Sequence, residues 1–188
     1  MLSGRRLDLL DPSPLDVEIE DIAHGLARVA RWNGQTSGDH AFSVAQHSLL
    51  VEAIVRTGGG DANLHQMALL HDAPEYVIGD MISPFKAVMG GGYKQVEERL
   101  QAAIHLRFSL PPAVPHGAKR CIKRADLVAA WYEATRLAGF AEHEATGFFG
   151  RPNGVSEVDL PLEPLGAVEA ERRYLERFHV IEAARRDA

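Results

Sequence analysis

The sequence has little of what secreted, membrane-spanning and nucleic-acid-binding proteins need. Its single cysteine, Cys121, excludes an internal disulfide and fits a reducing compartment. No apolar run approaches the roughly 18 residues of a membrane span, and residues 1–10 lack the apolar core of a signal peptide. A formal net charge of −6 leaves no basic surface for a nucleic-acid polymer. From these absences we expect a cytoplasmic protein with no membrane and no nucleic-acid partner.

What the chain does contain is ordinary for a globular protein. Of its 188 residues, 46% are hydrophobic and 24% are charged, and this length suffices for one substantial core. We therefore expect one domain over residues 1–188. Residues 1–16, which end in the turn-forming run DPSPLD, are predicted to form an extended arm with room for a short strand.

Apolar residues recur at helical spacing over most of the remaining chain. The pattern predicts a first helix from Glu18 to Asn33-Gly34, which would place Arg31 and Trp32 at its C-terminal end. Ser43 and Asp61 are predicted to cap the second and third helices. Further helices are expected over 93–108, over 117–137 and from about 163 onward. Residues 139–160 are expected to be irregular, with a weak strand candidate at 155–160.

Three ionisable residues occupy positions at which the helical pattern predicts an apolar core residue. His47, His71 and Asp126 each fall on the apolar face of a different predicted helix. A lone ionisable group is costly there unless it is partnered, and a shared metal ion would explain all three. With Asp72 they supply two imidazoles and two carboxylates, a set suited to Mn, Co, Fe, Zn or Mg. Such an ion activates water, so the set predicts a hydrolase, with phosphorus as the natural electrophile.

Two further acids follow this cluster along the chain. Pro74 interrupts the third helix, and Glu75 comes four residues after His71, so the two share a face if the helix resumes through Pro74. Asp80 lies on the next loop. An imidazole, two carboxylates and this additional acid within ten residues are half of a metal-hydrolase site.

Taken singly, each of these residues has an ordinary structural explanation. A buried histidine is more often hydrogen bonded in a core than bound to metal, and Asp126 could cap a helix or form a salt bridge. Glu75 could be a solvated acid, and Asp80 an ordinary turn residue. Arg31 could interact with a helix dipole, and Trp32 could cover the edge of the core. Lys86 could be a solvated charge on a loop.

Taken together, the ordered residues resemble the H…HD…D signature of the HD-domain metal-dependent phosphohydrolases. The flanking sequence is similar to a small bacterial branch, the 5′-deoxynucleotidases, over about residues 18 to 140. The matching segments are ARW at 30–32, SVAQHS at 43–48, LLHDAPE at 69–75, GD at 79–80, SPFK at 83–86 and KRAD at 123–126. The resemblance implies an all-α orthogonal helical bundle with the metal site at its centre, opened by loops 35–42 and 81–92.

The resemblance also implies roles for the residues that match the metal site. The ligands of one divalent ion (Co, Mn, Mg, Zn or Fe) would be His47, His71, Asp72 and Asp126. Glu75 matches an acid that handles protons for the attacking water or the leaving alkoxide. Asp80 matches a nearby acid that helps to protonate or orient the leaving group.

Three more residues match substrate contacts of the family. Arg31 matches a phosphate-binding arginine, whose planar guanidinium suits bidentate contact. Trp32 matches the aromatic residue that closes over the sugar and disfavours a 2′-hydroxyl, and Lys86 matches a lysine on the phosphate side. The chain departs from the deoxynucleotidase pattern at Gln46, where that group has an acid, and in the loop before His47, which is one residue longer.

We therefore expect a divalent-metal-dependent phosphohydrolase that removes the 5′-phosphate from nucleoside monophosphates, favouring deoxynucleotides, and the resemblance implies a homodimer. A deoxynucleoside triphosphate phosphohydrolase is an alternative, although triphosphate binding would need more basic residues than Arg31 and Lys86. The nearest reserves are Lys94, Lys119, Arg120 and Lys123. An alternative of another class is a non-catalytic nucleotide-binding module that the metal only stabilises.

Overall fold

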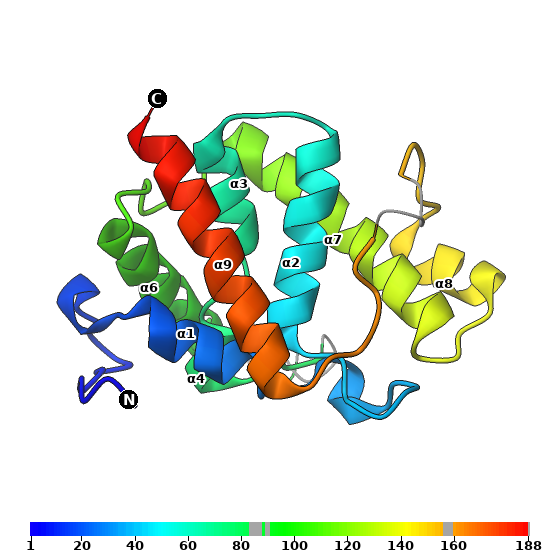
Figure 1. The fold of residues 1–188 in the computed structure, drawn as a ribbon, viewed down its shortest axis with the longest axis horizontal. Helices are drawn as coiled ribbons and strands as arrows, with labels where there is room; N and C mark the ends of the chain where they lie inside the picture. The colour runs from blue at the N-terminus through cyan, green and yellow to red at the C-terminus, as the bar shows by residue number, and fades with distance from the viewer. Residues whose placement is uncertain (83–87, 89–90, 156–159, 188) are drawn as a thin grey trace.

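The computed structural model describes residues 1–82, 88, 91–155 and 160–187, and this part of the chain is helical. The only β contact in it is an isolated antiparallel bridge between Ala30 and Ser43. The predicted all-α fold is confirmed (Figure 1). The elements in chain order are η1 (Pro14–Asp16), α1 (Ile19–Leu26), η2 (Arg31–Gly34), α2 (Val44–Thr57), α3 (Ala62–Leu69), α4 (Glu75–Ile78), α6 (Gly91–Arg107), α7 (His116–Arg136), α8 (Glu142–Phe149) and α9 (Ala167–Arg186).

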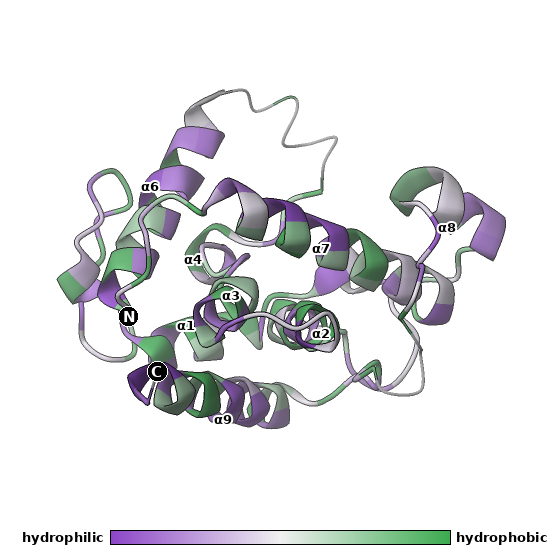
Figure 2. Cartoon of the chain, turned by 90° about the horizontal axis from the view of Figure 1, so that it is seen from above, coloured by the Kyte–Doolittle hydropathy of each residue, from purple (hydrophilic) through white to green (hydrophobic). Residues whose placement is uncertain are grey.

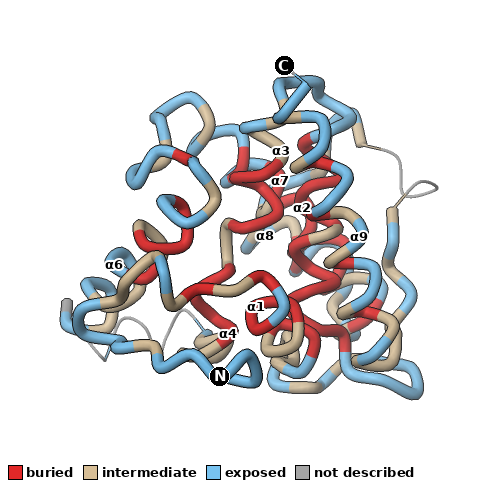
Figure 3. The backbone as a smooth tube through the Cα atoms, turned by 60° about the vertical axis from the view of Figure 1, so that its left-hand side comes forward, coloured by how far each residue is buried: buried red, intermediate tan, exposed pale blue. Residues whose placement is uncertain are grey.

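Helices α2 and α3 form the centre of the bundle. Viewed from above, they lie between α7 on one side and α9 on the other (Figure 2). Buried residues concentrate in these inner helices, and the outer turns and loops are exposed (Figure 3). Helix α9 covers the core with one apolar face, because its apolar positions recur every three to four residues; the buried residues of this face are Ala170, Tyr174, Phe178 and Ile181.

The two predicted helix caps are confirmed. The Ser43 side chain accepts a hydrogen bond from the Gln46 backbone N–H at 3.3 Å, at the start of α2. The Asp61 carboxylate accepts one from the Leu64 N–H at 2.8 Å, at the start of α3. Each cap satisfies an N–H group that has no partner inside its helix, and so fixes where these two central helices begin.

The predicted extent of the first helix is wrong. Helix α1 ends at Leu26, eight residues before Gly34. The chain then turns to pair with residues 42–44, where the Arg31 N–H donates to the Phe42 carbonyl at 2.8 Å. Arg31 and Trp32 therefore lie on the short η2 turn and not on a helix end. Trp32 adopts a left-handed backbone conformation with φ of 55°, which an α-helix does not contain.

The C-terminal third also differs from the sequence prediction. Residues 142–149 form helix α8, where an irregular segment is expected, and the Glu144 side chain caps it by accepting from the Ala141 N–H at 2.9 Å. The last helix begins at Ala167 and not near residue 163. Most of the strand candidate at 155–160 lies outside the described residues.

Residues 1–16 contain turns or bends at 2–4 and 9–11 and end in η1, and no strand lies among them. This N-terminal arm is fastened to α1, because the Ser3 N–H donates to the Asp21 carboxylate at 3.0 Å. In the parts of the chain that the structure describes, no helix is both long and apolar enough to pass through a membrane.

Helices α1 and α4 approach each other closely at Gly25. A Cβ atom added to Gly25 would lie 2.7 Å from the Tyr76 carbonyl oxygen and 2.8 Å from its Cβ. Only a residue without a side chain fits there. This contact sets the position of α4, whose first residue is Glu75.

We expect Gly25→Ala to lower the free energy of unfolding by about 1–3 kcal/mol, because α1 and α4 must separate to admit the methyl group. The matched control is Gly147→Ala, at an exposed position of α8 with no atom within 4 Å of the added Cβ. The control should be neutral or more stable by up to about 1 kcal/mol, because alanine favours a helix. Urea denaturation followed by circular dichroism measures both, and equal stabilities would contradict the close approach.

Candidate metal centre

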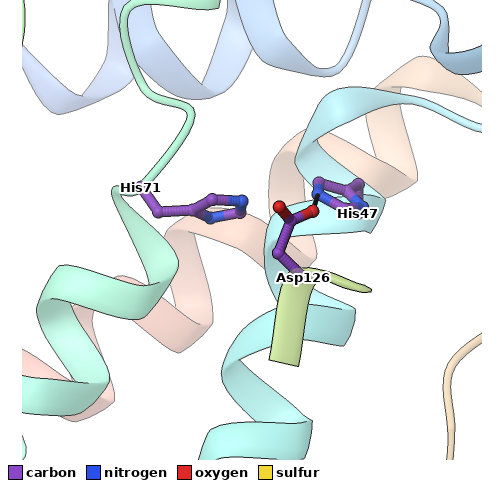
Figure 4. Close-up of side chains that lie close together, drawn as sticks. All are labelled: His47, His71 and Asp126. Atoms are coloured by element: carbon purple, nitrogen blue, oxygen red, sulfur yellow. Dashed lines mark ion pairs between the residues drawn. The ribbon is translucent and has the colours of Figure 1, made fainter. Parts of the chain in front are cut away.

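The structure brings the predicted metal ligands together from three parts of the chain. His47 comes from α2, His71 from the turn after α3, and Asp126 from α7 (Figure 4). One ligand atom from each of them lies within 4.8 Å of the other two. The Asp72 Oδ2 atom lies 3.2 Å from His71 Nε2 and 3.5 Å from His47 Nε2. Three of the four predicted ligands thus converge, and Asp72 lies against both histidines.

The His-Asp pair lies on a turn because the helix is interrupted there. Helix α3 ends at Leu69, and α4 begins after Pro74, which has no backbone N–H to continue the helix. In this turn the His71 Nδ1–H donates to the Ala68 carbonyl at 2.9 Å. This bond directs the opposite ring nitrogen, Nε2, toward the cluster.

The two imidazoles present the same kind of atom to the centre. His47 Nδ1 donates to the Glu133 carboxylate at 2.5 Å, so its Nε2 atom also faces inward. Both Nε2 atoms are buried, and among the described residues neither makes a well-formed hydrogen bond; each lies 3.2–3.5 Å from a carboxylate oxygen. A buried polar atom whose hydrogen bond is incomplete is costly. Nitrogen lone pairs beside carboxylate oxygens are what a borderline divalent cation binds, so the residues present fit such an ion.

The electrostatics of the cluster also favour a cation. Burial and the nearby Arg31 lower the pKa of His47, but Glu133 and Asp126 outweigh them and raise it to about 10. Burial raises the pKa of Asp72, whereas the neighbouring histidines lower it, and the pKa ends well below its usual range. The pKa of Asp126 is lowered in the same way, against its burial, chiefly by His47. Without a metal, a proton on His47 provides the positive charge between the carboxylates.

The cluster is open on its carboxylate side. The side chains of Asp72 and Asp126 are 27% and 22% exposed, whereas that of His47 is fully buried. Lys123 reaches this side, with its Nζ 2.8 Å from Asp126 Oδ2. A ligand of the ion would therefore approach past the two aspartates.

Arg31 lies beside the cluster and is held by two acids. Its Nη1 donates to Asp80 at 3.1 Å, and its Nε and Nη2 both donate to Glu133 at 3.4 Å. Burial lowers the pKa of Arg31, but Glu133, Asp80, Asp72 and Glu75 together raise it above its usual value. Arg31 is therefore a fixed cation, and Asp80 is placed against it.

Trp32 continues from Arg31 along the same edge of the site. Its Nε1–H donates to Glu133 at 2.9 Å, and its ring packs against Phe140 and Phe149 with centroid distances of 5.6 and 6.0 Å. Glu75 is buried in the first turn of α4. Lys86, the remaining predicted contact, lies outside the described residues, as does much of loop 81–92.

Sequence reasoning missed Glu133. This residue is fully buried and contacts His47, Arg31 and Trp32. The available signal was its spacing, because Glu133 follows Asp126 by seven residues and thus shares its face two turns along α7. A second acid on a face already carrying a candidate ligand marks a group that orients the site.

Gln46 points away from the metal centre. Its Nε2 donates to the Glu163 carbonyl at 2.7 Å, and its Oε1 accepts from the Leu165 N–H at 3.1 Å. The residue that departs from the deoxynucleotidase pattern thus holds the segment before α9. The departure leaves the described metal cluster unchanged.

Comparisons with known proteins agree with this geometry. The family model "5′-deoxynucleotidase YfbR-like" matches residues 22–144, which include the whole cluster and Glu133. The chain is 56% identical over 183 residues to an uncharacterized protein of Rhodobacter capsulatus, covering 96% of this chain and 93% of that protein. It is 29% identical over 174 residues to the uncharacterized protein YfdR of Escherichia coli, covering 92% and 89% of the two chains.

We expect metal binding to release about one proton near neutral pH. The pKa of His47 is raised from 6.5 to about 10 without metal, so its ring carries a proton that the ion must displace from Nε2. The apparent affinity should therefore rise as pH increases, by up to about tenfold per unit. Isothermal titration calorimetry in buffers of different ionisation enthalpy measures the protons released. A value of zero together with a pH-independent affinity would contradict ligation through His47.

Proposed function

Because the chain belongs to the YfbR-like 5′-deoxynucleotidase family of HD-type phosphohydrolases, we propose that it removes the 5′-phosphate from nucleoside monophosphates in a divalent-metal-dependent reaction, with deoxynucleotides preferred. The observation that carries this proposal is the convergence of two buried Nε2 atoms, from His47 and His71, on the carboxylates of Asp72 and Asp126. A fixed arginine stands beside them, and together these groups suit a phosphate ester.

A divalent ion held by His47, His71, Asp72 and Asp126 would supply Lewis-acid activation of water and of a phosphoryl oxygen. The chain's own part is to orient the reacting groups. Arg31 would bind the phosphate, since three of the five N–H bonds of a guanidinium are used by Asp80 and Glu133 among the described contacts. The remaining two can face phosphoryl oxygens, whose charge grows in the transition state.

We assign proton transfer to the two acids that follow the His-Asp pair. Glu75 is 2% exposed at the start of α4, where little bulk water competes for its proton. It would take a proton from the attacking water. Asp80 fixes Arg31 at 3.1 Å and would orient or protonate the leaving 5′-oxygen. Trp32 would form the wall against which the sugar lies, and a 2′-hydroxyl would then meet the ring.

One contact favours the triphosphate alternative. Among the basic reserves on α7, Lys123 reaches the metal cluster through its ion pair with Asp126. It would be available to additional phosphate groups if the ion replaced it as the partner of Asp126. We keep the monophosphate as the first proposal because Arg31 is a cation held at the site by Asp80 and by the buried Glu133.

Phosphate release from a panel of nucleoside and deoxynucleoside mono-, di- and triphosphates tests the proposal. The chelated protein is resupplied separately with Mn, Co, Mg and Zn. We expect metal-dependent release confined to 5′-monophosphates, with deoxy forms cleaved faster than ribo forms. Release of phosphate from triphosphates alone would show that the protein is a triphosphate phosphohydrolase, the alternative function. No release in the presence of bound metal would leave a hydrolase of another substrate or the non-catalytic module.

Glu75→Gln should retain metal and lose turnover by about 100-fold or more, because the amide cannot accept the proton. His71→Ala should lose metal affinity and turnover together. The matched control is Glu98→Gln, the same change at a side chain that is 65% exposed on α6, and it should leave both quantities unchanged. Metal affinity is measured by competition with a chromophoric chelator. Parent-level turnover in Glu75→Gln would remove Glu75 from the proton-transfer step.

A further inference from the structure

Glu133 touches both functional halves of the site. Its Oε1 accepts from the candidate metal ligand His47, and its Oε2 accepts from Trp32 and Arg31. We propose that Glu133 is a positioning residue that couples metal binding to recognition of the deoxyribose and phosphate. The recognition part of this inference rests on the proposed function, whereas the metal part stands on the geometry alone.

The first link is between Glu133 and the metal ligand. Asp126 and Glu133 lie seven residues apart on α7, which places them about 10 Å apart along the helix axis. The imidazole of His47 spans this gap, with Nδ1 2.5 Å from Glu133 and Nε2 3.4 Å from Asp126. Glu133 thereby fixes both the ring orientation and the tautomer that leaves Nε2 free to ligate. Carboxylates that hold a ligating histidine in this way strengthen metal binding.

The second link is between Glu133 and the substrate wall. The Trp32 ring is packed edge-on against Phe149 and tilted against Phe140, but these apolar contacts leave its indole N–H to be satisfied. Glu133 accepts that hydrogen bond at 2.9 Å. The Trp32 backbone is in a left-handed conformation, with φ of 55°, that a bulky residue adopts only when its surroundings impose it. The bond to Glu133 is a polar contact that helps to impose it.

Only a carboxylate satisfies all of these neighbours. His47, Trp32 and Arg31 each direct an N–H at Glu133, and an ionised carboxylate offers acceptors alone. The side chain is fully buried, so water does not replace a lost acceptor.

Glutamine has nearly the same shape but cannot serve both sides. With its NH₂ group toward His47, the ring must accept through Nδ1, and the proton moves to Nε2, where the metal should bind. With its NH₂ group toward Trp32 and Arg31, the amide N–H groups face the N–H groups of those two residues, and no hydrogen bond can form between them. Either orientation damages one half of the site, so metal affinity and substrate selectivity are joined through a single side chain.

We expect Glu133→Gln to weaken metal binding by about 10- to 100-fold. In the same variant, the ratio of deoxy to ribo turnover, measured at saturating metal, should fall toward one, and the Michaelis constant should rise. Trp32→Phe removes the indole N–H together with part of the ring but leaves the Glu133–His47 contact in place, so it should reduce the selectivity while metal affinity stays at the parent value. Metal affinity is measured on the folded, metal-free protein by chelator competition, which needs no turnover.

The control is Glu98→Gln, which should change neither metal affinity nor the deoxy-to-ribo ratio. If Glu133→Gln fails to fold, Glu133→Asp replaces it, because aspartate keeps the negative charge. The shorter acid should retain the tautomer of His47 better than glutamine does, and so bind metal more tightly. Parent-level metal affinity in folded Glu133→Gln would overturn the metal link. An unchanged deoxy-to-ribo ratio would overturn the recognition link. If the parent protein cleaves no nucleotide, the proposed function fails, but the metal comparison still decides the first link.

Discussion

The site depends on one buried contact, between the Glu133 carboxylate and the His47 imidazole. Neither group is exposed, and each would be costly to bury alone. Together they fix α2 against α7 at the level where Asp126 faces His47. Arg31 and Trp32 then attach to the other oxygen of the same carboxylate. Three segments of the chain, η2, α2 and α7, are therefore held together by one acid.

The ligand cluster could be predicted from the sequence because its members violate a regular pattern. His47, His71 and Asp126 interrupt apolar faces, and a periodicity of 3.6 residues shows such interruptions directly. Capping residues such as Ser43 were equally readable, since their preference is local. The resemblance to HD-type phosphohydrolases rested on these same residues, and the family match bears it out.

Features that depend on long-range contacts could not be predicted from the sequence. Helix α1 ends early because residues 29–31 pair their backbone with residues 42–44, and the local helical pattern contains no sign of this. Glu133 went unnoticed because an acid near the end of a long helix usually faces solvent. Helix α8 was missed because it has no extended apolar stripe and is held by separate side-chain contacts: Phe149 packs on Trp32, and the Thr146 hydroxyl accepts from the Trp131 indole N–H. Tertiary context overrode local preference in each case.

The position of α9 has a consequence for the order of events during synthesis. Tyr174 on this last helix donates to the Leu69 carbonyl at 3.1 Å, immediately before the turn that carries His71 and Asp72. Gln46 meanwhile holds the segment leading into α9. As the chain leaves the ribosome from its N-terminus, every cluster residue emerges before the helix that covers their scaffold. In a nascent chain, the backbone around Leu69 and the side chain of Gln46 therefore lack these contacts until the last helix and the segment before it have been synthesised.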